Sequence, residues 1–206
     1  MSGATMRAAV RRGAALTVTD VPDVVPEAGQ VVAKTLACGI CGSDLHAVHH
    51  LEHGVEIGRR CGAPDTIDPS QDLVLGHEFC AEILDHGPGT EKRFASGTRV
   101  VSTPFAFGPL GAELIGFSTR YRGALAERVV LTEALLLPVP NGLPSEIAAL
   151  TEPLSVGTHA VAVANPGQGS VAMVIGCGPI GLAVIVALKR RGIGPIIAAD
   201  FSPGGR

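Results

Sequence analysis

The chain of 206 residues is long enough for one large domain, or for one full domain and part of a second. Its content of 46% hydrophobic and 17% charged residues is typical of a folded globular chain and excludes a disordered one. A net charge of -3 and an aromatic content of 3% without Trp argue against a dedicated nucleic-acid binder, so no nucleic-acid partner is expected.

The N-terminal residues 1–12 contain no apolar stretch, so we expect no secretory signal and a cytoplasmic protein. In that compartment cysteines are more often thiols or metal ligands than disulfides. One segment, 171–188, is uncharged over eighteen residues and has the length of a marginal membrane span. Because glycines interrupt it in the pattern of a nucleotide-binding turn, no membrane partner is expected.

Residues 1–140 contain short strand-like segments separated by Gly or Pro clusters, which favours a small β-barrel or sandwich. The stretch 47–71 is polar and rich in turn residues, and it is predicted to be a surface excursion. A joint between domains is expected at Pro138, Pro140 and Pro144. The predicted strands lie at 6–10, 16–21, 30–37, 73–75, 79–84, 99–103 and 124–131.

After Pro144 the pattern becomes that of an α/β unit, so the domain boundary is placed between residues 144 and 145. The Ala-rich stretch that follows Pro144 suits a helix and begins with a cap-like Pro-Ser-Glu. The expected order is a helix at 145–163, a buried strand at 171–175, a helix at 180–191 and a second buried strand at 196–199.

A glycine-rich string, Gly176-Cys177-Gly178-Pro179-Ile180-Gly181, stands between the first of these strands and the next helix and fits G-x-G-x-x-G. Glycines let the backbone approach a pyrophosphate, and the helix N-terminus offers it free N–H groups. Asp200, 19 residues beyond the last glycine, would accept hydrogen bonds from ribose hydroxyls and repel a 2′-phosphate. The pattern therefore predicts NAD over NADP; the alternative is a plain α/β turn with glycines for packing.

Residues with zinc-ligand chemistry occur at three places: Cys38-x-x-Cys41, Gly76-His77-Glu78 and Glu152-Pro153. A C-x-x-C pair can be redox-active, structural or coincidental, and the lack of a second pair argues against a closed four-Cys site. One thiolate, one imidazole and one carboxylate with an open position would make a catalytic zinc site. Each residue alone also has an ordinary role, as a buried Cys, a core His or a capping Glu.

Taken together, these motifs resemble the zinc-dependent medium-chain dehydrogenases of the alcohol, sorbitol and polyol dehydrogenase group. The resemblance implies a β-rich, GroES-like catalytic domain over 1–144, followed over 145–206 by the beginning of an α/β Rossmann NAD-binding domain. EPLSVG is closest to the sorbitol dehydrogenase branch. The matching strings, in the family's order, are CGICGSDLH at 38–46, GHE at 76–78, GALAERVV at 123–130, EPLSVGTHA at 152–160 and the glycine-rich turn at 176–181.

The resemblance implies that Cys41 and His77 hold a catalytic zinc, and that Glu78 or Glu152 completes the shell directly or through water. Glu152 is placed near the zinc with its exact role left open. Cys38 is not expected to be a ligand.

The resemblance also implies roles around the metal. Ser43 would hydrogen-bond the substrate hydroxyl and His46 would pass its proton toward solvent. Asp44 would orient His77 and fix its tautomer.

Three departures from the family pattern stand out. The only Cys between His77 and Glu152 is Cys80, so one catalytic zinc and no structural zinc are expected. The excursion 47–71 adds residues, including His49, His50, His53 and Cys61, that reshape the substrate mouth, bind adventitious metal or simply form a solvated loop. The chain also holds only two of the roughly six strands of a doubly wound domain, so the coenzyme domain is expected to be incomplete.

The expected function is that of a zinc-dependent oxidoreductase that transfers a hydride from a small alcohol or polyol to NAD, with a homo-oligomeric full-length form. The alternative is a truncated, inactive remnant that serves as a zinc-binding or interaction module. A zinc-free reductase of the quinone oxidoreductase type is disfavoured by Cys41, His77 and Glu152.

Overall fold

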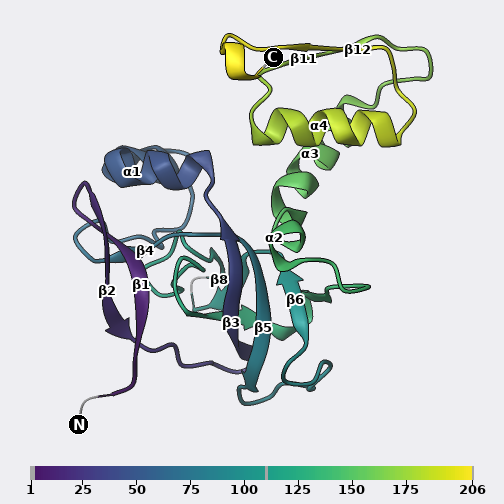
Figure 1. Ribbon diagram of the computed structural model, residues 1–206. Coiled ribbons are helices and arrows are strands. Elements are labelled where there is room, and N and C mark those ends of the chain that lie inside the picture. Colours follow the sequence, from purple (N-terminus) through teal and green to yellow (C-terminus); the bar gives the residue numbers. More distant parts are fainter. Residues whose placement is uncertain (1–2, 110, 206) are drawn as a thin grey trace. The chain divides into compact units, whose positions relative to one another are not determined.

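A computed structural model describes residues 3–109 and 111–205, and its contacts divide the chain into two compact units. The first extends to Ala149 and is mainly β, and the second begins at Leu150 and is α/β (Figure 1). A short helix, α2 (Ser145–Ala148), belongs to the first unit.

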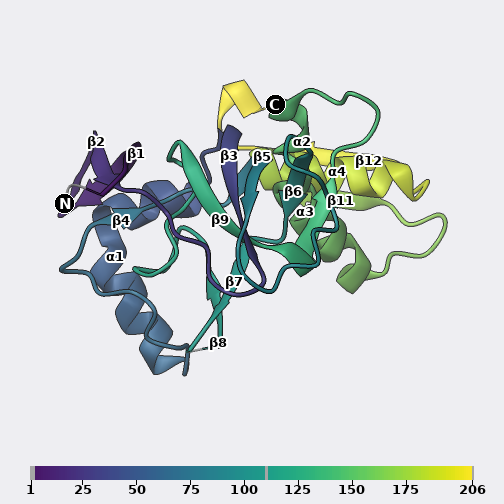
Figure 2. The same cartoon turned by 90° about the horizontal axis from the view of Figure 1, so that it is seen from below.

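The centre of the first unit is a five-stranded antiparallel sheet in the order β10-β6-β5-β3-β9. Figure 2 labels β6, β5, β3 and β9 of this sheet. Apolar residues alternate along its strands, so that Val31 and Ala33 face the same core as Val129 and Leu131. The strands are β3 (Gln30–Gly39), β5 (Glu78–His86), β6 (Arg99–Ser102), β9 (Arg128–Thr132) and β10 (Leu136–Pro138).

A second sheet has the order β2-β1-β4, in which Met6, Ala8 and Val10 of the central strand point into their own core. Its strands are β1 (Thr5–Arg12), β2 (Ala15–Pro22) and β4 (Leu73–Val74). A separate pair that was not predicted consists of β7 (Phe105–Gly108) and β8 (Gly111–Leu114), and a 3-10 turn η1 (Glu133–Leu135) precedes β10.

The predicted surface excursion at 47–71 is wrong over its first part, because helix α1 runs from Gly42 to Arg60. Ala47, Val48 and Leu51 lie at helical spacing and are buried against the segment that carries β4, around Leu73. The burial of these three apolar side chains stabilises the helix, even though the residues between them are polar. The helix is kinked at His50, whose φ and ψ are -134° and 28°.

The second unit contains two helices and a parallel strand pair. The predicted helix at 145–163 is interrupted, since α2 and α3 are separate. Gly157 permits close packing of α3 on α4, because a Cβ there would lie 2.6 Å from Ala183. The elements are α3 (Thr151–Ala164), β11 (Ala172–Ile175), α4 (Pro179–Arg190), β12 (Ile196–Ala199) and a 3-10 turn η2 (Pro203–Gly205).

The prediction that both strands of this unit are buried is wrong. Met173 and Ile175 of β11 are 60% and 72% exposed, and Ile197 of β12 is 51% exposed. Parallel strands are normally covered on both faces, and here the pair β11-β12 has no further hydrogen-bonded neighbour among the described residues.

The stretch Ser145–Ala164, which comprises α2 and α3, is long and apolar enough by length and composition to cross a membrane. Core helices of water-soluble proteins pass the same test, so the finding is weak. The uncharged segment 171–188 is divided into β11, the glycine-rich turn and α4.

Candidate metal centre and nucleotide-binding turn

Three side chains with zinc-ligand chemistry converge in the first unit. The ligand atoms of Cys41, His77 and Glu78 all lie within 4.8 Å of one another. Cys41 is the N-cap of α1, and the antiparallel register of β3 with β5 places Gly39 opposite Glu78. The fold thus brings two distant segments together. One thiolate, one imidazole and one carboxylate fit zinc, and within residues 3–109 and 111–205 no other group of this kind forms.

Asp44 ties the two segments of this site together. Its buried carboxylate accepts hydrogen bonds from the backbone N–H of Cys41 at 2.9 Å and of Gly76 at 3.2 Å. Its Oδ1 also lies 3.4 Å from His77 Nδ1, an ion-pair distance longer than a good hydrogen bond. A buried carboxylate beside a ligating imidazole is the arrangement that orients such ligands, as expected for Asp44.

The imidazole of His77 is buried, and its Nδ1 has no hydrogen-bond partner. Burial lowers the pKa of His77, but the neighbouring Asp44 and Cys41 side chains raise it by more, to about 9. The buried imidazole, with the thiol of Cys41 and the carboxylate of Glu78 beside it, suits a metal cation bound through the ring nitrogen that does not face Asp44. Because a metal needs the neutral imidazole, a proton and a metal compete for this side chain.

Cys38 differs from Cys41 in its surroundings. Burial, followed by the charges of Asp44 and Glu78, raises the pKa of Cys38 to about 12. Its Sγ donates to the carbonyl of Gly39 at 3.3 Å and sits where a Cβ on Gly76 would approach it to 2.9 Å. Cys38 is therefore a packed thiol, and the group formed by Cys41, His77 and Glu78 does not include it.

Ser43 and His46 lie three residues apart in the first turns of α1, on one face of the helix, and both are exposed. The ring centroid of His46 lies 4.8 Å from that of His50, one turn further on. His50 is one of the excursion residues that the sequence predicts to reshape the substrate mouth or bind adventitious metal, and its i, i+4 spacing from His46 accounts for their proximity.

Glu152 occupies the first turn of α3 in the second unit and is half-buried. The group formed by Cys41, His77 and Glu78 does not include it. A part for Glu152 in the metal site stays a prediction.

The glycine-rich turn joins β11 to α4 in the predicted way. Gly176 has a φ of +94°, and Gly181 packs so closely on the carbonyl of Gly176 that a side chain would overlap it. Gly178 is the N-cap of α4, followed by Pro179 at the first helical position and by Ile180. A Cβ on Gly178 would meet no atom within 4 Å. The helix N-terminus thus faces open space that a phosphate can enter.

Asp200 follows β12 and is held against this turn. Its Oδ2 accepts a hydrogen bond from the N–H of Cys177 at 2.6 Å, and its Oδ1 accepts one from Ser202 at 2.7 Å. These bonds lower the pKa of Asp200, so the group is a carboxylate at neutral pH. Sequence and structure therefore agree on its place beside the glycines.

Comparisons with known proteins give a consistent picture. The family model of the alcohol dehydrogenase GroES-like domain matches residues 27–141. The chain is 39% identical to (R,R)-butanediol dehydrogenase of Bacillus subtilis (strain 168) over 185 residues, which is 86% of this chain and 52% of that protein. It is 33% identical to sorbitol dehydrogenase of the same organism over 198 residues, 89% of this chain and 51% of that protein.

Solved structures show the same relationship. The crystal structure of 2R,3R-butanediol dehydrogenase from Bacillus subtilis matches with a TM-score of 0.78 at 30% identity, over 97% of this chain and 59% of that chain. The present chain spans about half the length of the curated relatives it matches.

Proposed function

Because the chain belongs to the zinc-dependent medium-chain alcohol dehydrogenase family, we propose that it supplies the catalytic zinc site and the coenzyme turn of an enzyme that transfers a hydride from an alcohol or polyol to NAD. The observation that carries the proposal is the convergence of Cys41, His77 and Glu78 within 4.8 Å, next to the exposed Ser43.

Cys41 and His77 would hold the zinc, with Glu78 or Glu152 completing the shell. A bound zinc ion supplies Lewis-acid chemistry, which makes an alcohol hydroxyl more acidic. Asp44 keeps the His77 ring in place through its position between Cys41 and Gly76.

Ser43 and His46 provide the path for the proton that leaves the hydroxyl. Ser43 accepts a hydrogen bond from the substrate, and His46, exposed on the same face of α1, carries the proton to solvent. Hydride and proton leave the alcohol separately, so a proton path distinct from the coenzyme is required.

Residues Gly176 to Gly181 and the N-terminus of α4 would hold the pyrophosphate of the coenzyme. Asp200 would accept hydrogen bonds from the ribose hydroxyls through lone pairs that Cys177 and Ser202 leave free. Its charge opposes a 2′-phosphate, which supports NAD.

Two measurements test the proposal. Elemental analysis of the purified chain should give one zinc per molecule. A hybrid that continues this chain with the second half of the Bacillus subtilis butanediol dehydrogenase should reduce NAD with an alcohol, and His77→Ala should abolish that activity. A hybrid that is folded and zinc-loaded but inert would favour the inactive zinc-binding module instead.

A further inference from the structure

A cavity of about 320 Å³ lies in the first unit between α1 and the loop that follows it. Ser43 and His46 line it where α1 begins, so it is continuous with the proposed proton path. Its wall also includes Phe117, whose ring packs edge-on against His77 with centroids 5.5 Å apart. The cavity therefore adjoins the metal centre as well as the proton path.

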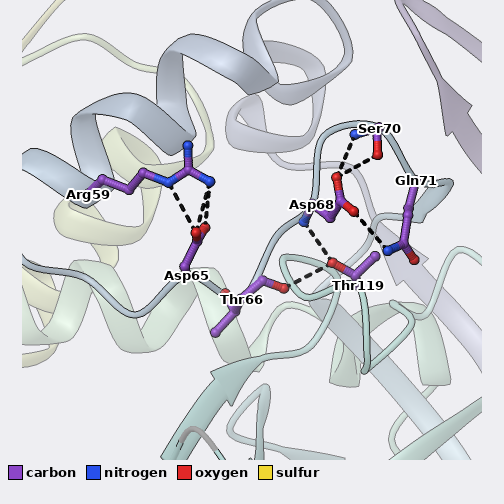
Figure 3. Close-up of polar contacts among 7 residues, drawn as sticks. All are labelled: Arg59, Asp65, Thr66, Asp68, Ser70, Gln71 and Thr119. Atoms are coloured by element: carbon purple, nitrogen blue, oxygen red, sulfur yellow. Dashed lines mark hydrogen bonds and ion pairs between the residues drawn. The ribbon is translucent and has the colours of Figure 1, made fainter.

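Beyond Ser43 and the histidines, the wall is mainly apolar, with Ala47, Leu51, Val55, Ile67 and Phe117. Arg59, near the end of α1, and Asp65, in the loop that follows, form hydrogen bonds with each other. Arg59 donates to both carboxylate oxygens of Asp65 at 2.8–3.2 Å (Figure 3). A hydroxyl placed against the buried Ala47 and Leu51 would lose its bonds to water without gaining equivalent partners.

Polar contacts outside the cavity fix its outer wall. Thr119 donates to the carbonyl of Thr66 from both its backbone N–H and its hydroxyl, at 2.9 and 3.1 Å. The Thr119 hydroxyl also accepts from the N–H of Asp68, whose carboxylate in turn binds Ser70 and Gln71 (Figure 3). Thr66 Oγ1 lies 3.3 Å from the carbonyl of Phe117. The wall is thus built before any ligand arrives, which lowers the cost of binding.

Two glycines contribute to the space inside. Gly54 and Gly58 both line the cavity from the second half of α1, one turn apart. Glycine costs a helix interior roughly 1 kcal/mol relative to alanine. A Cβ on Gly54 would meet nothing within 4 Å, and one on Gly58 would meet only Ala63, at 3.7 Å. A larger residue at Gly54 would therefore extend into open volume.

We propose that this cavity receives the apolar arm of the alcohol substrate, and that the substrate is an alcohol with a hydrocarbon substituent of several carbons, not a polyol. The inference rests on the proposed dehydrogenase function and deepens it by naming the substrate class. A volume of about 320 Å³ corresponds to roughly ten water molecules, more than a single terminal methyl group can fill. The satisfied charges and apolar wall disfavour the row of hydroxyls that a sugar alcohol would bring.

The test is an NMR titration of the isotope-labelled 206-residue chain with 2-octanol and, separately, with sorbitol. Chelator is present, so the result does not depend on zinc. 2-Octanol should shift amide signals of residues 47–67 and Phe117, and sorbitol at equal concentration should not. Gly54→Leu should weaken 2-octanol binding roughly tenfold, because the leucine occupies the same volume.

Glu56→Leu is the matched control, because it adds the same side chain to the same helix at an exposed position that does not line the cavity. It should bind 2-octanol like the parent chain. Ala63→Leu is a second cavity-filling variant, located in the loop after α1 and not in the helix. It should also weaken 2-octanol binding, which would show that the effect of Gly54→Leu does not come from a disturbed helix. Equal binding of sorbitol, shifts confined to other surfaces, or unchanged affinity in both filling variants would overturn the proposal. If the chain binds 2-octanol here but elemental analysis of the chelator-free protein finds no zinc, the proposed dehydrogenase function alone is contradicted.

Discussion

The two units solve the problem of burying apolar surface in different ways. The described residues of the first unit form four hydrophobic clusters. The second unit has one cluster around Val161 and Leu188, while Met173 and Ile175 stay largely exposed. Antiparallel sheets need cover on one face only, whereas a parallel pair needs cover on both.

This difference divides the proposed chemistry. The metal ligands Cys41, His77 and Glu78 lie in the unit that covers its own core, so their geometry is fixed by that unit. The nucleotide turn lies in the unit whose strands still present apolar faces. We therefore expect metal binding to be the more robust property of this chain, and the predictions below test that contrast.

The largest expected effect concerns the metal. Cys41→Ser or His77→Ala should reduce zinc occupancy from one per chain to near zero, because each removes a ligand from a set of three. Cys38→Ser should retain zinc, because Cys38 lies outside the group formed by Cys41, His77 and Glu78. Elemental analysis after dialysis measures this, with circular dichroism as the check on folding. Loss of zinc in Cys38→Ser alone would reverse the assignment of the two cysteines.

The second-largest expected effect is a difference in protease sensitivity between the two units. Under limited digestion with proteinase K, which has broad specificity, early cuts should fall within 150–205, where strands and helices expose apolar residues, and a fragment ending near Ala149 should persist. Mass spectrometry identifies the cuts. Added zinc should slow digestion of the first unit without protecting the second; equal resistance of both units would contradict the contrast.

A matched pair of isoleucines gives the contrast a free-energy scale. Ile83→Ala should destabilise the first unit by about 2–5 kcal/mol, because Ile83 is 1% exposed and its removal leaves a cavity. Ile175→Ala, at a strand position that is 72% exposed, should change the unfolding free energy of the second unit by less than about 0.5 kcal/mol. Hydrogen exchange on each unit measures both values. Similar costs would show that Ile175 is covered in solution.

The pH dependence of zinc binding sharpens the account of His77. Its pKa is about 9 without metal, so binding must displace a proton below that pH. Apparent zinc affinity should rise as pH rises from 6.5 to 9, by roughly tenfold per unit for each proton released. In the metal-free chain, the same raised pKa stabilises the fold below pH 6.5, and this contribution is lost as pH rises through about 9.

Competition with a chromophoric chelator measures the affinity at each pH. Asp44→Asn removes the negative charge that raises the pKa of His77. The zinc affinity of this variant should therefore depend less steeply on pH. An unchanged profile in Asp44→Asn would mean that Asp44 does not set the protonation of His77.

The smallest expected effect is on coenzyme choice. In the hybrid enzyme, Asp200→Asn should reduce the preference for NAD over NADP by roughly tenfold, because the charge that repels a 2′-phosphate is removed. The amide oxygen can still accept from Cys177, so the turn should persist. The ratio of kcat/KM for the two coenzymes is the measurement. Ser202→Ala leaves the Asp200 charge in place and should keep the parent ratio.

The sequence predicted well wherever local pattern and tertiary structure agree. The strand–turn–helix–strand order from Ala172 to Ala199 follows from an apolar run, a glycine-rich turn and a basic helix end, and the structure confirms it. The β-rich, GroES-like character of the first unit and the family are confirmed as well.

The failures come from properties that local pattern does not contain. α1 continues to Arg60 because Ala47, Val48 and Leu51 find a partner around Leu73, which is more than twenty residues away. The pair β7-β8 contains Gly, Ala and Glu and no β-branched residue, so its two Phe residues give only a weak strand signal. Burial of β11 depends on which elements cover it, and an apolar run does not specify them.

The surroundings of Cys38 also bear on how the chain withstands oxidation. Disulfide exchange, alkylation and attack by peroxide all proceed through the thiolate. With a pKa of about 12, Cys38 carries almost no thiolate at neutral pH. The Cys38-x-x-Cys41 pair is thus poorly suited to cycle between dithiol and disulfide, whatever its spacing suggests. Cellular oxidants should leave Cys38 intact and act on more exposed thiols, of which Cys61 is one.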